Sequence, residues 1–134
     1  MRRPHFELQE VKRLAQEDRF ALGMGPASGG ALESYLHGEL GSYRPFAQRV
    51  IQALTLEDFS HSRRWPEPEG ELADEYGLRL PAAVQEAFEV EVATWYVKVS
   101  VRSNRKEQLL FFMSLHPLAY EMWERNGGVL RPER

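Results

Sequence analysis

Apolar and polar residues alternate with a period of two in the second half of the chain. Three valines are interleaved with four polar residues: Val97, Val99 and Val101 with Tyr96, Lys98, Ser100 and Arg102. This pattern predicts a half-buried strand over residues 95–102, continuing a similar alternation over residues 88–92. A polar turn at 103–106 and an apolar run at 109–115 predict a second strand that completes a hairpin.

The first half of the chain instead carries apolar residues at helical spacing. They predict amphipathic helices over residues 6–14, 31–40 and 46–54, and Ser28 is a cap candidate after a glycine-rich break. Thr55 stands before an acidic pair, which predicts a helix cap with acidic residues in its first turn.

Apolar residues near the C-terminus predict one more short helix. They are Leu118, Met122 and Trp123. Gly127 and Gly128 would end this helix. Helices first and an antiparallel sheet afterwards indicate an α+β fold. We expect one domain over residues 1–134, with residues 117–134 as a C-terminal extension.

Composition excludes several classes of protein. The chain has 134 residues, of which 43% are hydrophobic, and this suffices for a real core. No apolar run approaches the ~20 residues of a membrane helix, and no secretory signal is visible at the N-terminus. The absence of cysteine excludes disulfides, thiol nucleophiles and cysteine zinc sites. We therefore expect a cytoplasmic protein with no membrane partner.

The net charge of −3 hides an uneven distribution. Residues 67–91 hold eight acidic residues against one arginine, whereas residues 92–116 hold four cationic residues against one glutamate. An acidic segment of this kind can face a basic partner, while the basic strand pair can face phosphate. The overall acidity is nevertheless unusual for a protein that binds nucleic acid.

Known motifs of catalysis are absent from the sequence. The four histidines are His5, His37, His61 and His116, and no two of them are three or four residues apart. The glycine-rich segments match neither a phosphate-binding loop nor a dinucleotide fingerprint, and no serine hydrolase motif is present. We expect neither a metal nor a cofactor, although a metal site assembled by folding stays open.

The polar face of the predicted hairpin is the best remaining candidate for chemistry. This face carries Tyr96, Lys98, Ser100 and Arg102 from the first strand together with Ser114 and His116 from the second. A phenol, cations and an imidazole together offer a general acid, a general base and a phosphate clamp. The structural alternative is an ordinary solvated face of a sheet.

Five segments, in order along the chain, resemble motifs of the MqsR family of toxins. Residues 4–14 resemble its opening Pro-His and its Leu-x-x-Val-Lys-x-Leu helix. Residues 50–59 resemble its Val-Ile-x-x-Leu-Ser/Thr-x-x-Asp-Phe segment, and residues 74–76 resemble its Asp-Val-Tyr. Residues 95–101 resemble its Val-Tyr-Leu-Lys strand, and residues 109–115 resemble its last strand, which ends in Ser-Phe-Lys.

The resemblance implies a RelE-like α+β fold, with N-terminal helices packed on a twisted antiparallel sheet. It also implies ribosome-independent endonucleolytic cleavage of mRNA and a partner, the antitoxin encoded beside the toxin. The catalytic Tyr of the family falls on Tyr96, and a Lys falls on Lys98. Two further family lysines fall on His61 and His116, and a family Gln falls on Ala73.

The two histidines suit RNA cleavage without a metal. Attack by the 2′-hydroxyl needs a base, an acid at the 5′-oxygen and cations on the phosphorane, and imidazole with a pKa of ~6.5 suits proton transfer better than lysine at ~10.4. His61 and His116 would flank a phosphate bound by Lys98, while Tyr96 orients the 2′-hydroxyl or stacks on a base. The candidate phosphate-binding arginines are Arg63, Arg64, Arg102 and Arg105.

Two other interpretations remain open. The chain can be a non-catalytic RelE-fold module that binds RNA or protein, because the family's Gln and two of its lysines are replaced. It can also be an unrelated interaction domain that docks through the acidic residues 67–91. In that case Arg63 and Arg64 pair with acidic neighbours at the surface, and Tyr96 is a cross-strand packing residue. A homodimer is compatible with every interpretation.

Overall fold

The structure is a computed structural model that describes residues 3–23, 43–65, 71–103, 105–124 and 127–133. Its elements, in chain order, are α1 (Leu8–Gln16), β1 (Phe20–Leu22), α3 (Tyr43–Ala53), the 3₁₀ helix η2 (Leu56–Asp58), β2 (Phe59–Trp65), β3 (Glu71–Arg79), α4 (Ala82–Phe88), β4 (Thr94–Ser103), β5 (Gln108–Pro117), β6 (Met122–Trp123) and β7 (Val129–Leu130). Five strands form one sheet in the order β1-β5-β4-β3-β2, and β6 pairs with β7 in a separate ribbon.

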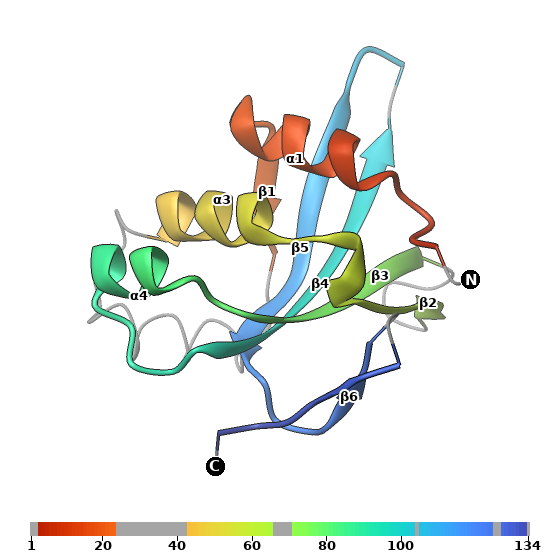
Figure 1. Ribbon diagram of the computed structural model, residues 1–134. Coiled ribbons are helices and arrows are strands. Elements are labelled where there is room, and N and C mark those ends of the chain that lie inside the picture. The colour runs from red at the N-terminus through yellow and green to blue at the C-terminus, as the bar shows by residue number, and fades with distance from the viewer. Residues whose placement is uncertain (1–2, 24–42, 66–70, 104, 125–126, 134) are drawn as a thin grey trace.

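The helices and the C-terminal ribbon lie on opposite sides of this sheet (Figure 1). α1, α3 and α4 cover one face, and the core between them and the sheet contains the fully buried Phe46, Trp95 and Phe112. The rings of Phe46 and Trp95 meet edge to face at 5.1 Å. The polar residues of β4 therefore lie on the other face, on the side of the ribbon.

Strand β1 makes the sheet mixed. It runs parallel to β5, with Phe20 opposite Leu110, whereas all other pairs in the sheet are antiparallel. The predicted α+β fold is confirmed, but the prediction of a wholly antiparallel sheet is wrong. β1 has only three residues, which is too short to show a readable alternation, and it follows α1 through a turn at Asp18, whose φ is 61°.

Strands β2 and β3 were not predicted from the sequence. In β3 every residue from Ala73 to Leu78 is buried. The helices cover one face of this strand and the ribbon covers the other, so its side chains show no simple apolar and polar alternation. A strand that is buried on both faces is hard to recognise by periodicity.

Two of the predicted helices are present. α1 begins at Leu8, two residues later than predicted, because the backbone N–H groups of His5 and Phe6 each donate to the buried carboxylate of Asp74, at 2.9 Å. α3 occupies the predicted third helix. None of the helices in the described residues is long and apolar enough to cross a membrane. The helix predicted over residues 31–40, and Ser28, lie outside the described residues.

The predicted cap at Thr55 is confirmed, but the turn that follows it is short. The N–H of Thr55 donates to the carboxylate of Asp58 at 2.8 Å, which forms half of a capping box. The helix is the single 3₁₀ turn η2, and the chain enters β2 at Phe59 directly after it. Phe59 is buried against the ring of Tyr76, which draws the chain into the sheet.

The strand predicted over residues 88–92 is wrong. Phe88 is the last residue of α4, where its ring packs on Phe46 at 5.3 Å. Glu89 ends the helix in the left-handed conformation, with φ 54°, and Val90 then turns back into the core. The alternation in this segment arises from a helix end followed by a buried loop residue.

The predicted C-terminal helix is also wrong. Leu118 and Met122 are buried, but they belong to a cluster with Leu130 on β7, so the chain folds back as the β6–β7 ribbon. Trp123 stays 63% exposed. The strand that pairs with β6 is β7, which lies beyond the turn at Gly127. A spacing of four residues between two apolar positions is too short a pattern to distinguish a helix from this ribbon.

Candidate functional site

Strands β4 and β5 place two rows of polar side chains next to each other on the face opposite the helices. Tyr96 pairs with His116 across the two strands, and Lys98 pairs with Ser114. The rings of Tyr96 and His116 are 5.0 Å apart. The prediction that these four residues share one face of a hairpin is confirmed, because all four line one pocket.

A β-bulge in β5 makes this polar face compatible with an apolar core. Lys98 pairs with Ser114, whereas Val99 pairs with Phe112, so Met113 is an extra residue in β5. A one-residue shift exchanges the two faces of a strand. Ser114 therefore lines the pocket while Phe112, two positions earlier, is fully buried under the helices.

Strands β3 and β2 extend the polar face with residues from earlier in the chain. Glu75 of β3 lies opposite Lys98 on one side and opposite His61 of β2 on the other. Arg63, two residues after His61 on the same strand, also contacts Glu75. Directly opposite residues point to the same side of a sheet, so four neighbouring strands contribute side chains to one site.

The C-terminal ribbon forms the remaining wall of the site. It packs against β3 at Gly77, where a Cβ atom would lie 3.0 Å from side-chain atoms of both Met122 and Leu130. A side chain at this position would displace both neighbours by a few tenths of an ångström, so glycine favours the close approach. Beyond the ribbon, the carboxylate of Glu133 accepts a hydrogen bond from the N–H of Thr94 at 3.1 Å and fixes the end of the described chain to β4.

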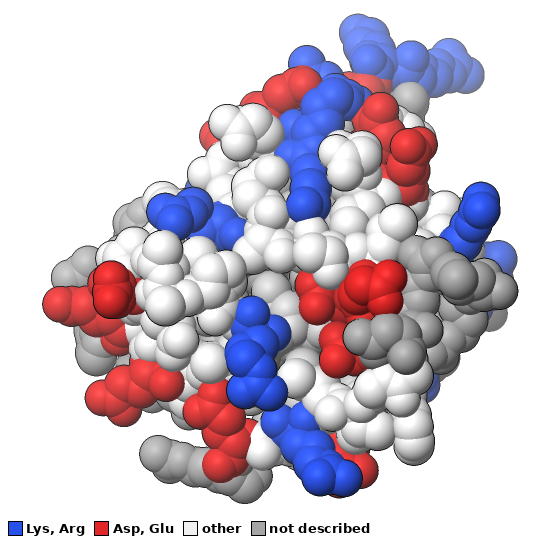
Figure 2. Space-filling model, in the orientation of Figure 1, with Lys and Arg blue, Asp and Glu red and all other residues white. Residues whose placement is uncertain are grey.

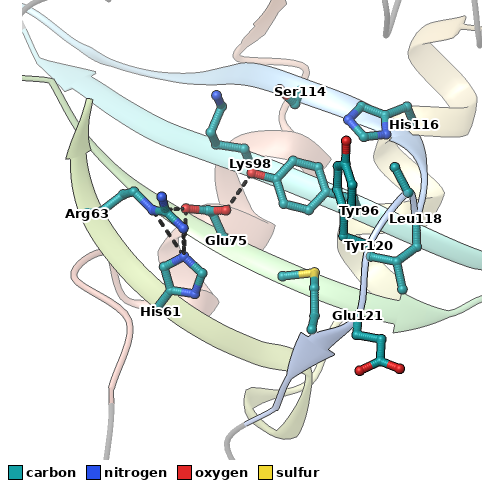
Figure 3. Close-up of a pocket in the computed structure, with 12 residues that line it drawn as sticks. His61, Arg63, Glu75, Tyr96, Lys98, Ser114, His116, Leu118, Tyr120 and Glu121 are labelled. Carbon is teal, nitrogen blue, oxygen red and sulfur yellow. Dashed lines mark hydrogen bonds and ion pairs between the residues drawn. The ribbon is translucent and has the colours of Figure 1, made fainter. Parts of the chain in front are cut away.

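These walls enclose a pocket of about 390 Å³ (Figure 3). Its lining residues are His61, Arg63, Glu75, Tyr96, Lys98, Ser114, His116, Leu118, Ala119, Tyr120, Glu121 and Met122. All four residues predicted to be catalytic are among them, as is one of the four predicted phosphate-binding arginines. Pockets of this size hold small organic ligands.

Glu75 lies at the centre of the polar wall and is only 3% exposed. Its Oε1 accepts a hydrogen bond from the hydroxyl of Tyr96 at 2.6 Å. Its Oε2 lies 2.8 Å from Nε of Arg63 and 3.0 Å from Nε2 of His61. A buried carboxylate needs such partners to keep its charge. Glu75 is not among the site residues predicted from the sequence.

The two histidines of the pocket are held in different ways. His61 is bound at both nitrogens, because Nδ1 lies 2.9 Å from the hydroxyl of Ser60 and Nε2 contacts Glu75 and Arg63. In His116, Nδ1 lies 2.7 Å from the carbonyl oxygen of Pro117. A carbonyl oxygen only accepts, so Nδ1 of His116 carries the proton and Nε2 of the neutral ring has its lone pair.

Burial changes the acidity of the two predicted catalytic residues of β4. Burial, together with the carboxylate of Glu75, raises the pKa of the Tyr96 hydroxyl well above its ordinary value, so this phenol stays protonated. Burial lowers the pKa of the Lys98 ammonium, although the nearby Glu75 opposes this effect. Lys98 therefore gives up its proton more easily than a solvated lysine.

Three of the predicted phosphate-binding arginines do not line the pocket. Arg102 forms two hydrogen bonds with the carboxylate of Glu71, each 2.8 Å long, at the far end of β4. Arg64 follows Arg63 on β2, and strand alternation turns it to the other side. Arg105 lies at the tip of the β4–β5 hairpin, where basic side chains gather at the top of Figure 2.

The acidic segment 67–91 contains both buried and exposed carboxylates in the part of it that the structure describes. Asp74 and Glu75 are buried, and Glu71 is paired with Arg102. On the face shown in Figure 2, acidic side chains lie in separate groups among basic and neutral ones. The charged residues can be counted from the sequence, but the fold decides which of their side chains are buried.

The sequence places an acidic residue at position 75, but it does not show on which face of a strand the side chain of Glu75 lies. Glu75 stands between Asp74 and Tyr76, which are both fully buried on the other face of β3, so its side chain points away from theirs. Where the MqsR motif has Val, this chain has Glu. Without the pairing of β3 with β4, nothing related this position to Lys98 and Tyr96.

No group of three or more His, Asp or Glu in the described residues is arranged to hold a metal ion. Comparisons of the sequence with protein-family models and with curated proteins find no match.

Proposed function

We propose that the pocket is the active site of a metal-independent endoribonuclease that cleaves single-stranded mRNA by attack of the 2′-hydroxyl. The observation that carries this proposal is the orientation of His116. Its Nδ1 is committed to the carbonyl of Pro117, so Nε2 can accept a proton in a pocket that also contains Lys98 and Arg63. A proton acceptor beside two cations is what this reaction needs.

The reaction follows from the roles of these residues. Nε2 of His116 takes the proton of the 2′-hydroxyl, and the 2′-oxygen forms a bond to phosphorus. The bond from phosphorus to the 5′-oxygen breaks, and the ammonium of Lys98 gives its proton to that oxygen. Arg63 and Lys98 balance the charge of the phosphorane. The products are a 2′,3′-cyclic phosphate and a 5′-hydroxyl, and exchange with water returns both protons.

Glu75 and His61 have a supporting role in this proposal. Glu75 holds the Tyr96 hydroxyl and the Arg63 guanidinium in place, at 2.6 and 2.8 Å, and His61 completes the cluster. His61 is tied at both nitrogens, so we assign proton transfer to His116 and Lys98 and the positioning of Arg63 to His61. Tyr96 lies beside His116, where its ring can contact the sugar or base of the substrate.

The resemblance to MqsR toxins and their RelE-like fold is part of the proposal. It is supported by the presence of His61 in one pocket with Tyr96, Lys98 and His116, since His61 is far along the chain from the other three positions. It is weakened by Ala73 in place of the family Gln, because Ala73 is fully buried and has no polar group. On this proposal the partner of the chain is an antitoxin protein.

One observation favours the alternative of a non-catalytic binding module. The carboxylate of Glu75 already neutralises Arg63 inside the pocket, so less positive charge is available for a phosphorane. Under this alternative the pocket binds RNA or a protein without cleaving it.

The decisive experiment incubates the folded protein, purified free of any bound partner, with a long single-stranded RNA in excess EDTA. Discrete cuts with 2′,3′-cyclic phosphate ends support the proposal. Loss of cleavage in EDTA, with recovery on addition of a divalent ion, contradicts the metal-independent mechanism. Intact RNA that is nevertheless bound, measured by anisotropy, supports the binding module instead.

A further inference from the structure

The pocket has two chemically different sides. One side comes from the sheet, and we call it the cationic side because it holds Arg63 and Lys98; His61, His116 and the carboxylate of Glu75 lie on it as well. The other side is aromatic and apolar and comes mainly from the segment that leads into the ribbon: Leu118, Ala119, Tyr120 and Met122, with Tyr96 between the two sides. A nucleotide has the same division, because its phosphate is charged and its base is a flat, largely apolar ring.

Tyr120 is the most exposed large hydrophobic residue in the described chain, at 82%. It contributes nothing to the core, whereas its neighbours Leu118 and Met122 are buried and hold the ribbon on the sheet. Figure 3 shows its ring at the pocket beside Tyr96, with the hydroxyl pointing in the direction of His116 in this view. Such a ring is available for a flat partner.

We propose that Tyr120 stacks on one nucleobase of a single-stranded RNA, so that the phosphate joined to that nucleoside lies on the cationic side of the pocket. This inference rests on the proposed function and specifies how the substrate is held. One sugar separates a base from its phosphate, so a single nucleotide can reach both sides of one pocket. Stacking on an aromatic ring accepts any base, which predicts affinity for RNA with weak sequence preference.

The charges at the rim of the pocket set the direction of the substrate. Glu121 lies on the ribbon side and forms an ion pair with Arg131 at 3.1 Å. Lys98 and Arg63 favour a phosphate on the sheet side, where Glu75 partly offsets their charge, whereas none of the described residues on the ribbon side contributes a cation to the lining of the pocket. The base is thereby directed to Tyr120 and the phosphate to the residues assigned to catalysis.

The experiment measures equilibrium binding and does not depend on cleavage. The probe is a short, fluorescently labelled 2′-O-methyl RNA, which lacks the attacking hydroxyl, and a matched series in which one position at a time is abasic. Tyr120→Ala is expected to weaken binding by about 5- to 150-fold, the usual effect of losing one base–aromatic stack. Tyr120→Phe keeps the ring and is expected to restore the affinity.

The matched control is Trp123→Ala. Trp123 is an exposed aromatic residue on the same ribbon that does not line the pocket, so its removal is expected to leave binding unchanged. In the abasic series, one position is expected to weaken binding to the wild type and to have no further effect on Tyr120→Ala. This loss of additivity identifies the stacked base.

The outcomes separate the inference from the function on which it rests. If Tyr120→Ala binds like the wild type, or if Trp123→Ala loses as much affinity, the stacking inference is wrong even when RNA is cleaved. If binding depends on Tyr120 but RNA stays intact, the stacking inference holds and the nuclease assignment is wrong. If the wild type binds no RNA, both are wrong, and capture of a protein through Tyr120 becomes the question.

Discussion

The polar face of β4 has two halves with the same sequence pattern and different surroundings. In the half near Trp95, Tyr96 and Lys98 line the pocket. In the half near the hairpin tip, Ser100 donates its hydroxyl to the carbonyl of Leu72 at 2.9 Å and is 2% exposed. Next to it, Arg102 is bound to Glu71.

The hairpin half is closed by its own contacts. The guanidinium of Arg102 is held by both carboxylate oxygens of Glu71 and lies 3.6 Å from the centre of the Phe111 ring. A bidentate pair stacked on a ring occupies the donors that a phosphate would need. This half therefore supports the sheet, and neither Ser100 nor Arg102 lines the pocket.

The pocket half remains open because of three features that the hairpin half lacks. The bulge at Met113 turns Ser114 and His116 to the polar face. Gly77 lets the C-terminal ribbon approach, and the ribbon forms a second wall. Nε2 of His116 can accept a proton, because Nδ1 is the ring nitrogen that donates to the carbonyl of Pro117. A row of charges on a strand becomes a site only where a wall and a proton-transfer group are added.

Among the tests of this comparison, replacement of His116 has the largest expected effect. We expect His116→Ala to lower the rate of RNA cleavage about 10²–10⁴-fold, because it removes the proposed general base. The melting temperature should change little, since the ring is only partly buried. His5→Ala is the matched control, because His5 is exposed and outside the pocket. A His116→Ala protein that cleaves at the wild-type rate contradicts the assignment.

Replacement of the two cations of the polar face is expected to affect different properties, cleavage for Lys98 and stability for Arg102. Lys98→Met should reduce cleavage about 100-fold, the usual cost of losing one group that stabilises the transition state. Arg102→Met should leave cleavage unchanged and lower the free energy of unfolding by about 1 kcal/mol or less, because the Arg102 side chain is 45% exposed. Cleavage assays and chemical denaturation of both variants measure this difference, and equal losses of activity would remove the distinction between the halves.

The two glutamates of β3 allow a third test. Glu75→Gln removes a negative charge that faces Arg63 in the pocket, so we expect it to bind the 2′-O-methyl RNA severalfold more tightly. Its affinity should also fall more steeply with added salt, because Arg63 no longer faces a carboxylate and its charge acts more fully on phosphate. Glu71→Gln is the control and should leave both quantities unchanged. Identical behaviour of the two variants would show that Glu75 does not compete with phosphate.

The smallest expected effect concerns pH and the hairpin half alone. The Arg102 guanidinium lowers the pKa of Glu71 below its ordinary value of 4.5. A lowered pKa in the folded state stabilises the fold above pH 4.5, and this contribution is lost as the pH falls below that value. Thermal unfolding on both sides of pH 4.5 should show a smaller loss for Glu71→Gln than for the wild type. An equal loss in the two proteins contradicts the assignment.

Much of the local structure follows from the sequence. β4 and β5 were predicted within one or two residues because their alternation is strict. α1 and α3 were predicted within two or three residues because their apolar residues recur at helical spacing. The wrong predictions fall in segments whose apolar spacing is compatible with more than one kind of element. Val90 follows a helix end, and Leu118 and Met122 pack under a ribbon, although each shows an apolar spacing that other elements also have.

The candidate site was predicted only in the part that belongs to the β4–β5 hairpin. Tyr96, Lys98, Ser114 and His116 are close because the two strands are joined by a short turn, so local periodicity was sufficient to group them. The grouping of His61 with them came from the family resemblance and not from periodicity.

The sequence by itself determined which residues are available for chemistry and which of them share a face of a hairpin. Tertiary structure decided that Glu75, Arg63 and His61 join that face, that Arg102 is occupied by Glu71, and that the C-terminal segment encloses a pocket. The physical reason is that periodicity reports only which side of its own strand a residue occupies. Its neighbours depend on the register between strands that are distant in the chain, and that register is set by burial of the whole core.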